Sequence, residues 1–145
     1  MRNNGTAGLL KIVIMGLSDI FGSKGLQYAD FEKWVDTSLS IGLPNEIQAF
    51  CFNLYEDGGG NWSAEIIGAA SFDKEDSDWA CDEVFDNRKK PIRWKSRDTW
   101  EKQLPSFQSV LETYLKKGKY AALLKGKRGL GFGFVDGDLK IIPIE

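Results

Sequence analysis

Two neighbouring segments with an apolar period of two constrain the fold of this 145-residue chain more than any other feature. Residues 47–55 and 62–72 alternate as β-strands do, and the loop between them, residues 56–61, contains three glycines that tolerate positive φ. This order predicts a β-hairpin. The first segment is apolar on both faces, which predicts a central strand covered on at least one side by helices. Its two faces are Phe50, Phe52 and Leu54 against Ala49, Cys51 and Tyr55.

Three segments have the apolar spacing of helices. The first covers residues 9–21, and the second begins at Asp30, a good N-cap, and ends with Gly42 and Pro44. The third follows an N-cap sequence at residues 98–101 and continues to about residue 118. Pro105 either kinks this helix or marks the first turn of its main part. The apolar positions of the third helix are Trp100, Leu104, Phe107, Leu111 and Tyr114.

The C-terminal segment returns to a period of two. Leu130, Phe132 and Phe134 alternate with glycines, residues 136–137 are a tight-turn signal, and residues 139–142 follow as a strand, so a second hairpin is expected. The glycine-rich run 126–133 fits no nucleotide-binding fingerprint. We interpret its glycines as a strand face against which another element packs closely.

The predicted elements add up to one α+β domain over residues 1–145, since this length is typical of a single domain. We expect a mainly antiparallel sheet built from two hairpins, with three helices packed on it. A further short strand is indicated at residues 91–94.

The composition narrows the function, because the chain contains no histidine. It therefore lacks an imidazole acid or base, a triad of the usual kind and a histidine-ligated zinc. Two cysteines, Cys51 and Cys81, are too few for a disulfide framework and are interpreted as reduced packing residues. We expect no catalytic residues, no metal and no cofactor. A cytoplasmic protein is expected, because the apolar run at residues 9–17 is cut by Lys11 and is too short to span a bilayer.

The strongest local charge feature is an acidic segment, residues 73–86, with seven acids and one lysine. The calcium-loop template fails here, because the sixth residue is Asp78 and the twelfth is Val84. A solvated loop, an acidic docking surface with aromatic anchors, and a site for metal or catalysis remain open. The candidate partner-binding residues are Asp73, Glu75, Asp76, Asp78, Trp79, Asp82, Glu83, Phe85 and Asp86.

A basic strip follows directly, with six cationic residues and no acid in residues 88–97. Together with nearby tryptophans it has the composition of a nucleic-acid surface. The alternative is that the strip folds back on the acidic segment and neutralises it. Its cationic residues are Arg88, Lys89, Lys90, Arg93, Lys95 and Arg97.

Residues 52–56, 68–73, 76–85 and 133–138 resemble small bacterial proteins that are often encoded beside polymorphic or contact-dependent toxins. The resemblance implies an immunity protein: a non-catalytic cytoplasmic binder that blocks a toxin domain, often a nuclease with a basic cleft. Carboxylates on a rigid scaffold can occupy such a cleft and steer association. On this hypothesis, loss of rim charges slows association and Trp79→Ala speeds dissociation. Nucleic-acid binding through the basic strip is the alternative function.

Overall fold

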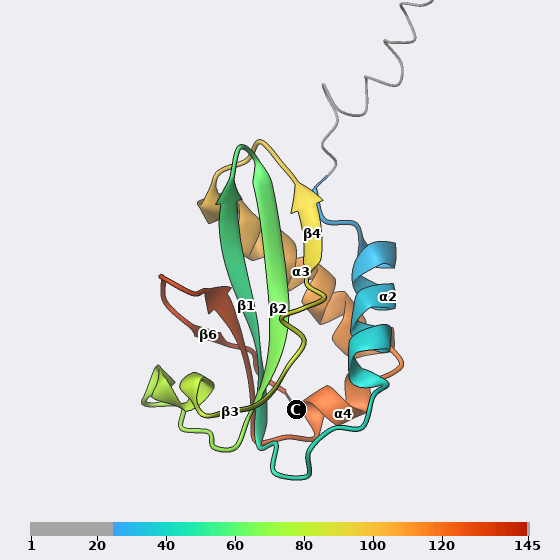
Figure 1. The fold of residues 1–145 in the computed structure, drawn as a ribbon, viewed down its shortest axis with the longest axis vertical. Helices are drawn as coiled ribbons and strands as arrows, with labels where there is room; N and C mark the ends of the chain where they lie inside the picture. The colour runs from blue at the N-terminus through green and yellow to red at the C-terminus, as the bar shows by residue number, and fades with distance from the viewer. Residues whose placement is uncertain (1–24, 145) are drawn as a thin grey trace, which may run out of the picture.

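The hairpin predicted at residues 47–72 forms the centre of the protein (Figure 1). The computed structural model describes residues 25–144. Strand β1 (Ala49–Gly58) pairs antiparallel with β2 (Asn61–Ala69), and Gly58, Gly59 and Gly60 adopt positive φ in the turn between them. Only glycine takes up such a run of left-handed conformations without strain. The prediction of this hairpin is confirmed.

The sheet has six strands in the order β3-β2-β1-β5-β6, with β4 also paired to β2. Strand β5 (Gly129–Phe134) lies parallel to β1, and β6 (Lys140–Ile141) pairs antiparallel with β5. Strands β3 (Glu83–Asp86) and β4 (Ile92–Lys95) pair antiparallel with β2. The α+β class and the mainly antiparallel sheet are confirmed. The sheet is not simply two hairpins, because β3 and β4 extend it and β1 and β5 are parallel.

Asn87 lies between β3 and β4 in the sequence and bonds to β2, with which both of these strands pair. Its side-chain oxygen accepts a 2.7 Å hydrogen bond from the backbone N–H of Ile66, and its own backbone N–H donates to the Ile66 carbonyl at 3.1 Å. Its amide nitrogen donates to Ser38 Oγ at 2.7 Å. Asn87 therefore continues the hydrogen bonding along β2 between the parts that pair with β3 and β4. It also ties this edge of β2 to the helix that contains Ser38.

Two of the predicted helices lie in the described residues. Helix α2 (Tyr28–Leu39) begins before Asp30, which lies in its first turn rather than at its N-cap. Helix α3 (Trp100–Lys117) is continuous through Pro105, near its exposed N-terminal end, where water can solvate the carbonyl left without its N–H partner. The helix predicted at residues 9–21 lies outside the described residues. A short helix that was not predicted, α4 (Ala121–Lys125), follows α3.

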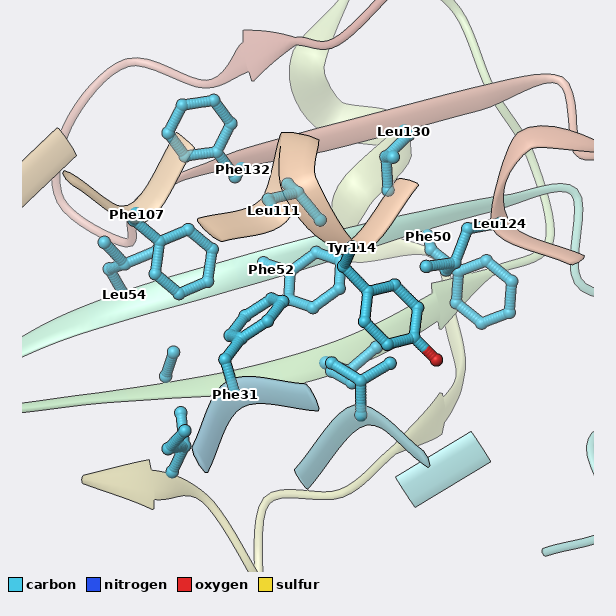
Figure 2. Packing of buried hydrophobic residues seen from close by; sticks show 14 of the residues in the cluster. Phe31, Phe50, Phe52, Leu54, Phe107, Leu111, Tyr114, Leu124, Leu130 and Phe132 are labelled. Carbon is cyan, nitrogen blue, oxygen red and sulfur yellow. The ribbon is translucent and has the colours of Figure 1, made fainter. Parts of the chain in front are cut away.

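The helices cover one face of the sheet, which we call the helical face. Aromatic rings from both layers meet there: Phe31 of α2, Phe52 of β1, and Phe107 and Tyr114 of α3 (Figure 2). The Phe107 ring lies edge-on to Phe31 at 5.5 Å and stacks on Phe132 of β5 at 6.0 Å. Burial of these rings is the main source of stability on this face.

No helix in residues 25–144 is long and apolar enough to cross a bilayer.

The other face, which we call the second face, depends on the glycines of β5. A Cβ on Gly131 would lie 3.2 Å from both Leu139 and the Trp79 ring, and one on Gly133 would lie 2.6 Å from the Asp138 carbonyl oxygen. The interpretation of a glycine face that admits close packing is therefore confirmed. The elements packed on it are the 3₁₀ helix η2 (Ser77–Cys81) and the turn between β5 and β6.

This close approach predicts the effect of adding one methyl group. Gly133→Ala forces the Cβ against backbone that no side-chain rotation can move, and we expect a loss of about 1–3 kcal/mol in the free energy of unfolding, measured in urea. Gly42→Ala is the matched control, because a Cβ there meets nothing within 4 Å, and its change should stay within about 0.5 kcal/mol. Equal effects of the two substitutions would contradict this account.

Candidate functional site

The acidic segment is folded rather than a free loop. It forms η2 and then β3, and the Ala70 N–H donates to the Asp82 carbonyl at 2.9 Å where the segment returns to the sheet. All seven of its acidic side chains are exposed. The predicted acidic surface is therefore a row of exposed carboxylates on a defined backbone, at Asp73, Glu75, Asp76, Asp78, Asp82, Glu83 and Asp86.

The two aromatic residues of the segment correct the sequence-based expectation. Trp79 is only 4% exposed, with its ring 5.1 Å from that of Phe72, in a small core with Cys51 and Ile67. Phe85 is 9% exposed and belongs to the main core on the helical face. These rings are not free anchors for a partner, because the apolar residues of the sheet already bury them. They hold the acidic segment on its own sheet.

The carboxylates divide into those used by the fold and those left free. Asp73 and Asp76 accept backbone N–H bonds at 2.9 and 3.0 Å within their own turns, and Asp86 accepts the Arg88 N–H at 2.8 Å. These side chains fix the backbone. Within residues 25–144, hydrogen bonds and ion pairs are absent from the side chains of Glu75, Asp78 and Asp82.

A buried carboxylate, Glu65, lies at the centre of the second face. Glu65 is 1% exposed and comes from the middle of β2. Its oxygens accept hydrogen bonds from Asn53 Nδ2 at 3.0 Å and Tyr55 OH at 2.6 Å, both on β1. They also accept Arg88 Nε at 2.6 Å and Nη2 at 3.3 Å. Sequence reasoning missed this residue, although an acid within the apolar run of residues 62–69 was a visible signal, because a buried charge needs a partner.

The network keeps Glu65 ionised. Burial alone raises the pKa of a carboxyl, but hydrogen bonds from Arg88, Tyr55 and Asn53 outweigh it, and the pKa of Glu65 is lowered. Burial and the bond to Glu65 raise the pKa of Tyr55 to about 12. Both oxygens of Glu65 are already occupied by donors. Its geometry therefore suits it to orient Arg88.

Arg88 links this centre to the acidic segment. Its guanidinium donates to Glu83 at 2.9 Å and lies 3.7 Å from Asp86, while its side chain is 50% exposed. A pocket of about 380 Å³ opens here, lined by Glu65, Asp78, Glu83, Asp138 and Arg88 among others. Four acids against one arginine leave these lining charges at −3. The pocket is therefore suited to a cation.

The basic strip does not fold back on the acidic segment as a whole. Of its six cations only Arg88 forms ion pairs within residues 25–144. Trp94 is 7% exposed and donates its indole N–H to Gln103, so its ring is not available for base stacking. The other five cations are exposed side chains: Lys89, Lys90, Arg93, Lys95 and Arg97.

The two cysteines differ. Cys51 is fully buried, burial raises the pKa of its thiol to about 12, and its interpretation as a packing residue is confirmed. Cys81 is exposed beside the acidic pocket, so its interpretation as a packing residue is wrong. In the part of the chain that the structure describes, histidine, cysteine and acidic side chains do not gather in any group of three that could hold a metal ion.

The lowered pKa of Glu65 predicts a pH-dependent contribution to stability. A group whose pKa is lower in the folded state stabilises the fold above its unfolded pKa, about 4.3, and loses this effect as the pH falls through the folded pKa. Glu65→Gln should cost about 2 kcal/mol in urea unfolding at pH 7. This difference from the wild type should shrink toward pH 3, and a difference independent of pH would contradict the assignment.

Burial of Trp79 predicts that its removal acts on folding. Trp79→Ala should lower the free energy of unfolding by about 3–5 kcal/mol. Trp79→Phe keeps a ring against Phe72 and removes an indole N–H that has no hydrogen-bond partner in residues 25–144, so it should cost much less. Urea unfolding of the two variants measures this, and an unfolding free energy unchanged by Trp79→Ala would show that the ring is not part of a core.

Comparison of the chain with family models, with curated proteins and with solved structures finds no match.

Proposed function

We propose that this protein is a non-catalytic immunity protein that acts in the bacterial cytoplasm, where it binds and neutralises a toxin domain. The acidic surface, formed by the acidic segment and the pocket beside Arg88, is the binding site in this proposal. The observation that supports it most is the set of three exposed carboxylates without a partner in the described residues, on a backbone held by a buried core. Those carboxylates are Glu75, Asp78 and Asp82.

The chemistry of these carboxylates favours a basic partner. The backbone beside them is held in place, because η2 is anchored through Trp79 and β3 through Phe85 and its pairing with β2. Like charges on a held backbone attract a cationic surface, and the backbone loses little freedom on binding. A nuclease toxin offers such a surface, because its active-site cleft binds phosphates.

The occupied Glu65 carboxylate supports the absence of catalysis. Glu65 is the most buried acid beside the pocket, and both of its oxygens accept hydrogen bonds, from Asn53, Tyr55 and Arg88. A general base needs a lone pair that reaches the substrate, and Glu65, which is 1% exposed, offers almost no surface to one. In this proposal Glu65 and Arg88 shape the binding surface, and the toxin is inhibited because its cleft is occupied.

The proposal predicts a specific effect of two neutral substitutions. The protein is used to capture its partner, and cells that express the captured toxin domain are then tested for growth with each variant. Asp78→Asn with Asp82→Asn should slow association about tenfold and weaken protection, because it removes free rim charges and leaves the turn hydrogen bonds intact.

The matched control is Asp30→Asn with Glu46→Gln, which removes the same charge from exposed positions outside the acidic segment. It should protect cells as the wild type does. Equal protection by both double variants would reject this binding surface. Salt-sensitive binding of RNA, with no captured protein, would reject the proposal and favour the basic strip.

A further inference from the structure

One tryptophan stands apart from the others because its ring is exposed. Trp62, Trp79 and Trp94 are between 3% and 7% exposed and Trp34 is partly buried, whereas Trp100, the first residue of α3, is 51% exposed. Its ring lies nearly perpendicular to that of Phe134, at 84° and 6.3 Å between centroids. The two rings thus form a corner at the surface. An exposed tryptophan is the residue type that most often dominates a binding interface.

A groove of about 630 Å³ opens beside this corner. Trp100, Leu104 and Phe134 supply its apolar lining, between the start of α3 and the turn after β5. A second hollow on the hairpin side also has Trp100 in its wall, together with Gly59 and Gly60 of the tight turn. Figure 1 shows the hairpin tip and the start of α3 at the same end of the molecule. The exposed ring is therefore accessible from two sides.

The charges around the groove are mainly negative. Glu56, Asp136 and Asp138 line it, against the single cation Lys140, which leaves these charges at −2. The three acids are exposed, and no ion pair involves them within residues 25–144. An aromatic face next to unpaired carboxylates attracts a cationic side chain in two ways, through the ring quadrupole and through direct charge pairing.

The groove adjoins the acidic pocket. Phe134, Gly137 and Asp138 line both of them, so the turn between β5 and β6 forms the ridge between the two hollows. A partner that covers the pocket therefore lies within reach of the Trp100 ring. The aromatic anchor that the sequence suggested within the acidic segment has a structural counterpart across this turn.

We propose that the groove binds a lysine or arginine side chain of the partner protein, with its cation over the Trp100 ring and in contact with the carboxylates of Glu56, Asp136 and Asp138. The inference rests on the proposed function in one respect, the basic character of the partner. It adds a second contact region that the acidic segment does not contain. Phe134 supports the Trp100 ring through its edge-on contact. Leu104 contacts the aliphatic part of the bound side chain.

The test uses an arginine-rich decapeptide as the probe and the full chain labelled with ¹⁵N. The indole N–H signals of the five tryptophans report on each ring separately. The Trp100 signal should shift most as the peptide is added, and the shift should weaken as salt rises. A glutamate-rich decapeptide should leave it unchanged. An oligothymidylate that shifts Trp100 more than the arginine peptide would overturn the proposal in favour of nucleic acid.

Variants separate the ring from its apolar area. Trp100→Leu keeps an apolar side chain but removes the ring face. It should lower the affinity for the arginine peptide about threefold. Asp136→Asn with Asp138→Asn should lower the affinity for the peptide by a similar factor. The control is Ile41→Ala, since Ile41 is 56% exposed on another part of the surface, and it should bind as the wild type does. Equal peptide affinity of Trp100→Leu and wild type would overturn the proposal.

The same variants distinguish failure of the groove from failure of the proposed function. If the double variant Asp78→Asn with Asp82→Asn weakens binding of the captured toxin domain but Trp100→Leu does not, the groove is rejected. The immunity proposal then stands. If the peptide binds at Trp100 but the wild-type protein captures no toxin domain and protects no cells, the groove stands and the immunity proposal is rejected.

Discussion

The ion pair between the buried Glu65 and the half-exposed Arg88 is the polar interaction that holds the second face together. A carboxylate that is 1% exposed is costly unless donors surround it, and here three residues from two parts of the chain do so. Asn53 and Tyr55 fix it to β1, while Arg88 connects it to Glu83 and Asp86 of β3. The network thereby ties the end of the acidic segment to β1 and β2 and engages two of its carboxylates, Glu83 and Asp86.

The two faces of the sheet have different tasks. The helical face buries aromatic rings from α2, α3, β1 and β5, and it provides most of the apolar burial. The second face has only a small core, built on Cys51, Ile67 and Trp79, and is otherwise polar. Such a division leaves the second face free to display charge, because its fold does not depend on covering it with helices. The glycines of β5 bring the acidic elements close to the sheet.

The sequence predicted what depends on local order and missed what depends on contacts between distant segments. The central hairpin, the glycine face and both described long helices follow from short-range periodicity and turn residues. The parallel pairing of β1 with β5 has no local signal. The sequence of aromatic residues among acids is compatible both with rings that contact a partner and with rings buried in the protein's own core. Only the position of the Trp79 and Phe85 rings against the sheet decides between the two. Trp100 fits the helical spacing of a core residue, yet it lies at the exposed start of α3.

We propose that a basic protein partner covers the acidic surface, and the exposed thiol of Cys81 tests this proposal most directly. Cys81 lines the acidic pocket, whereas Cys51 is fully buried, so a thiol reagent applied to the folded protein reports on Cys81. The measurement is the rate of labelling of this thiol with and without the captured partner, at the same ionic strength. We predict that the thiol in the complex is labelled at least about tenfold more slowly, because the interface buries it. An unchanged labelling rate in a stable complex would place the partner elsewhere and contradict the claim.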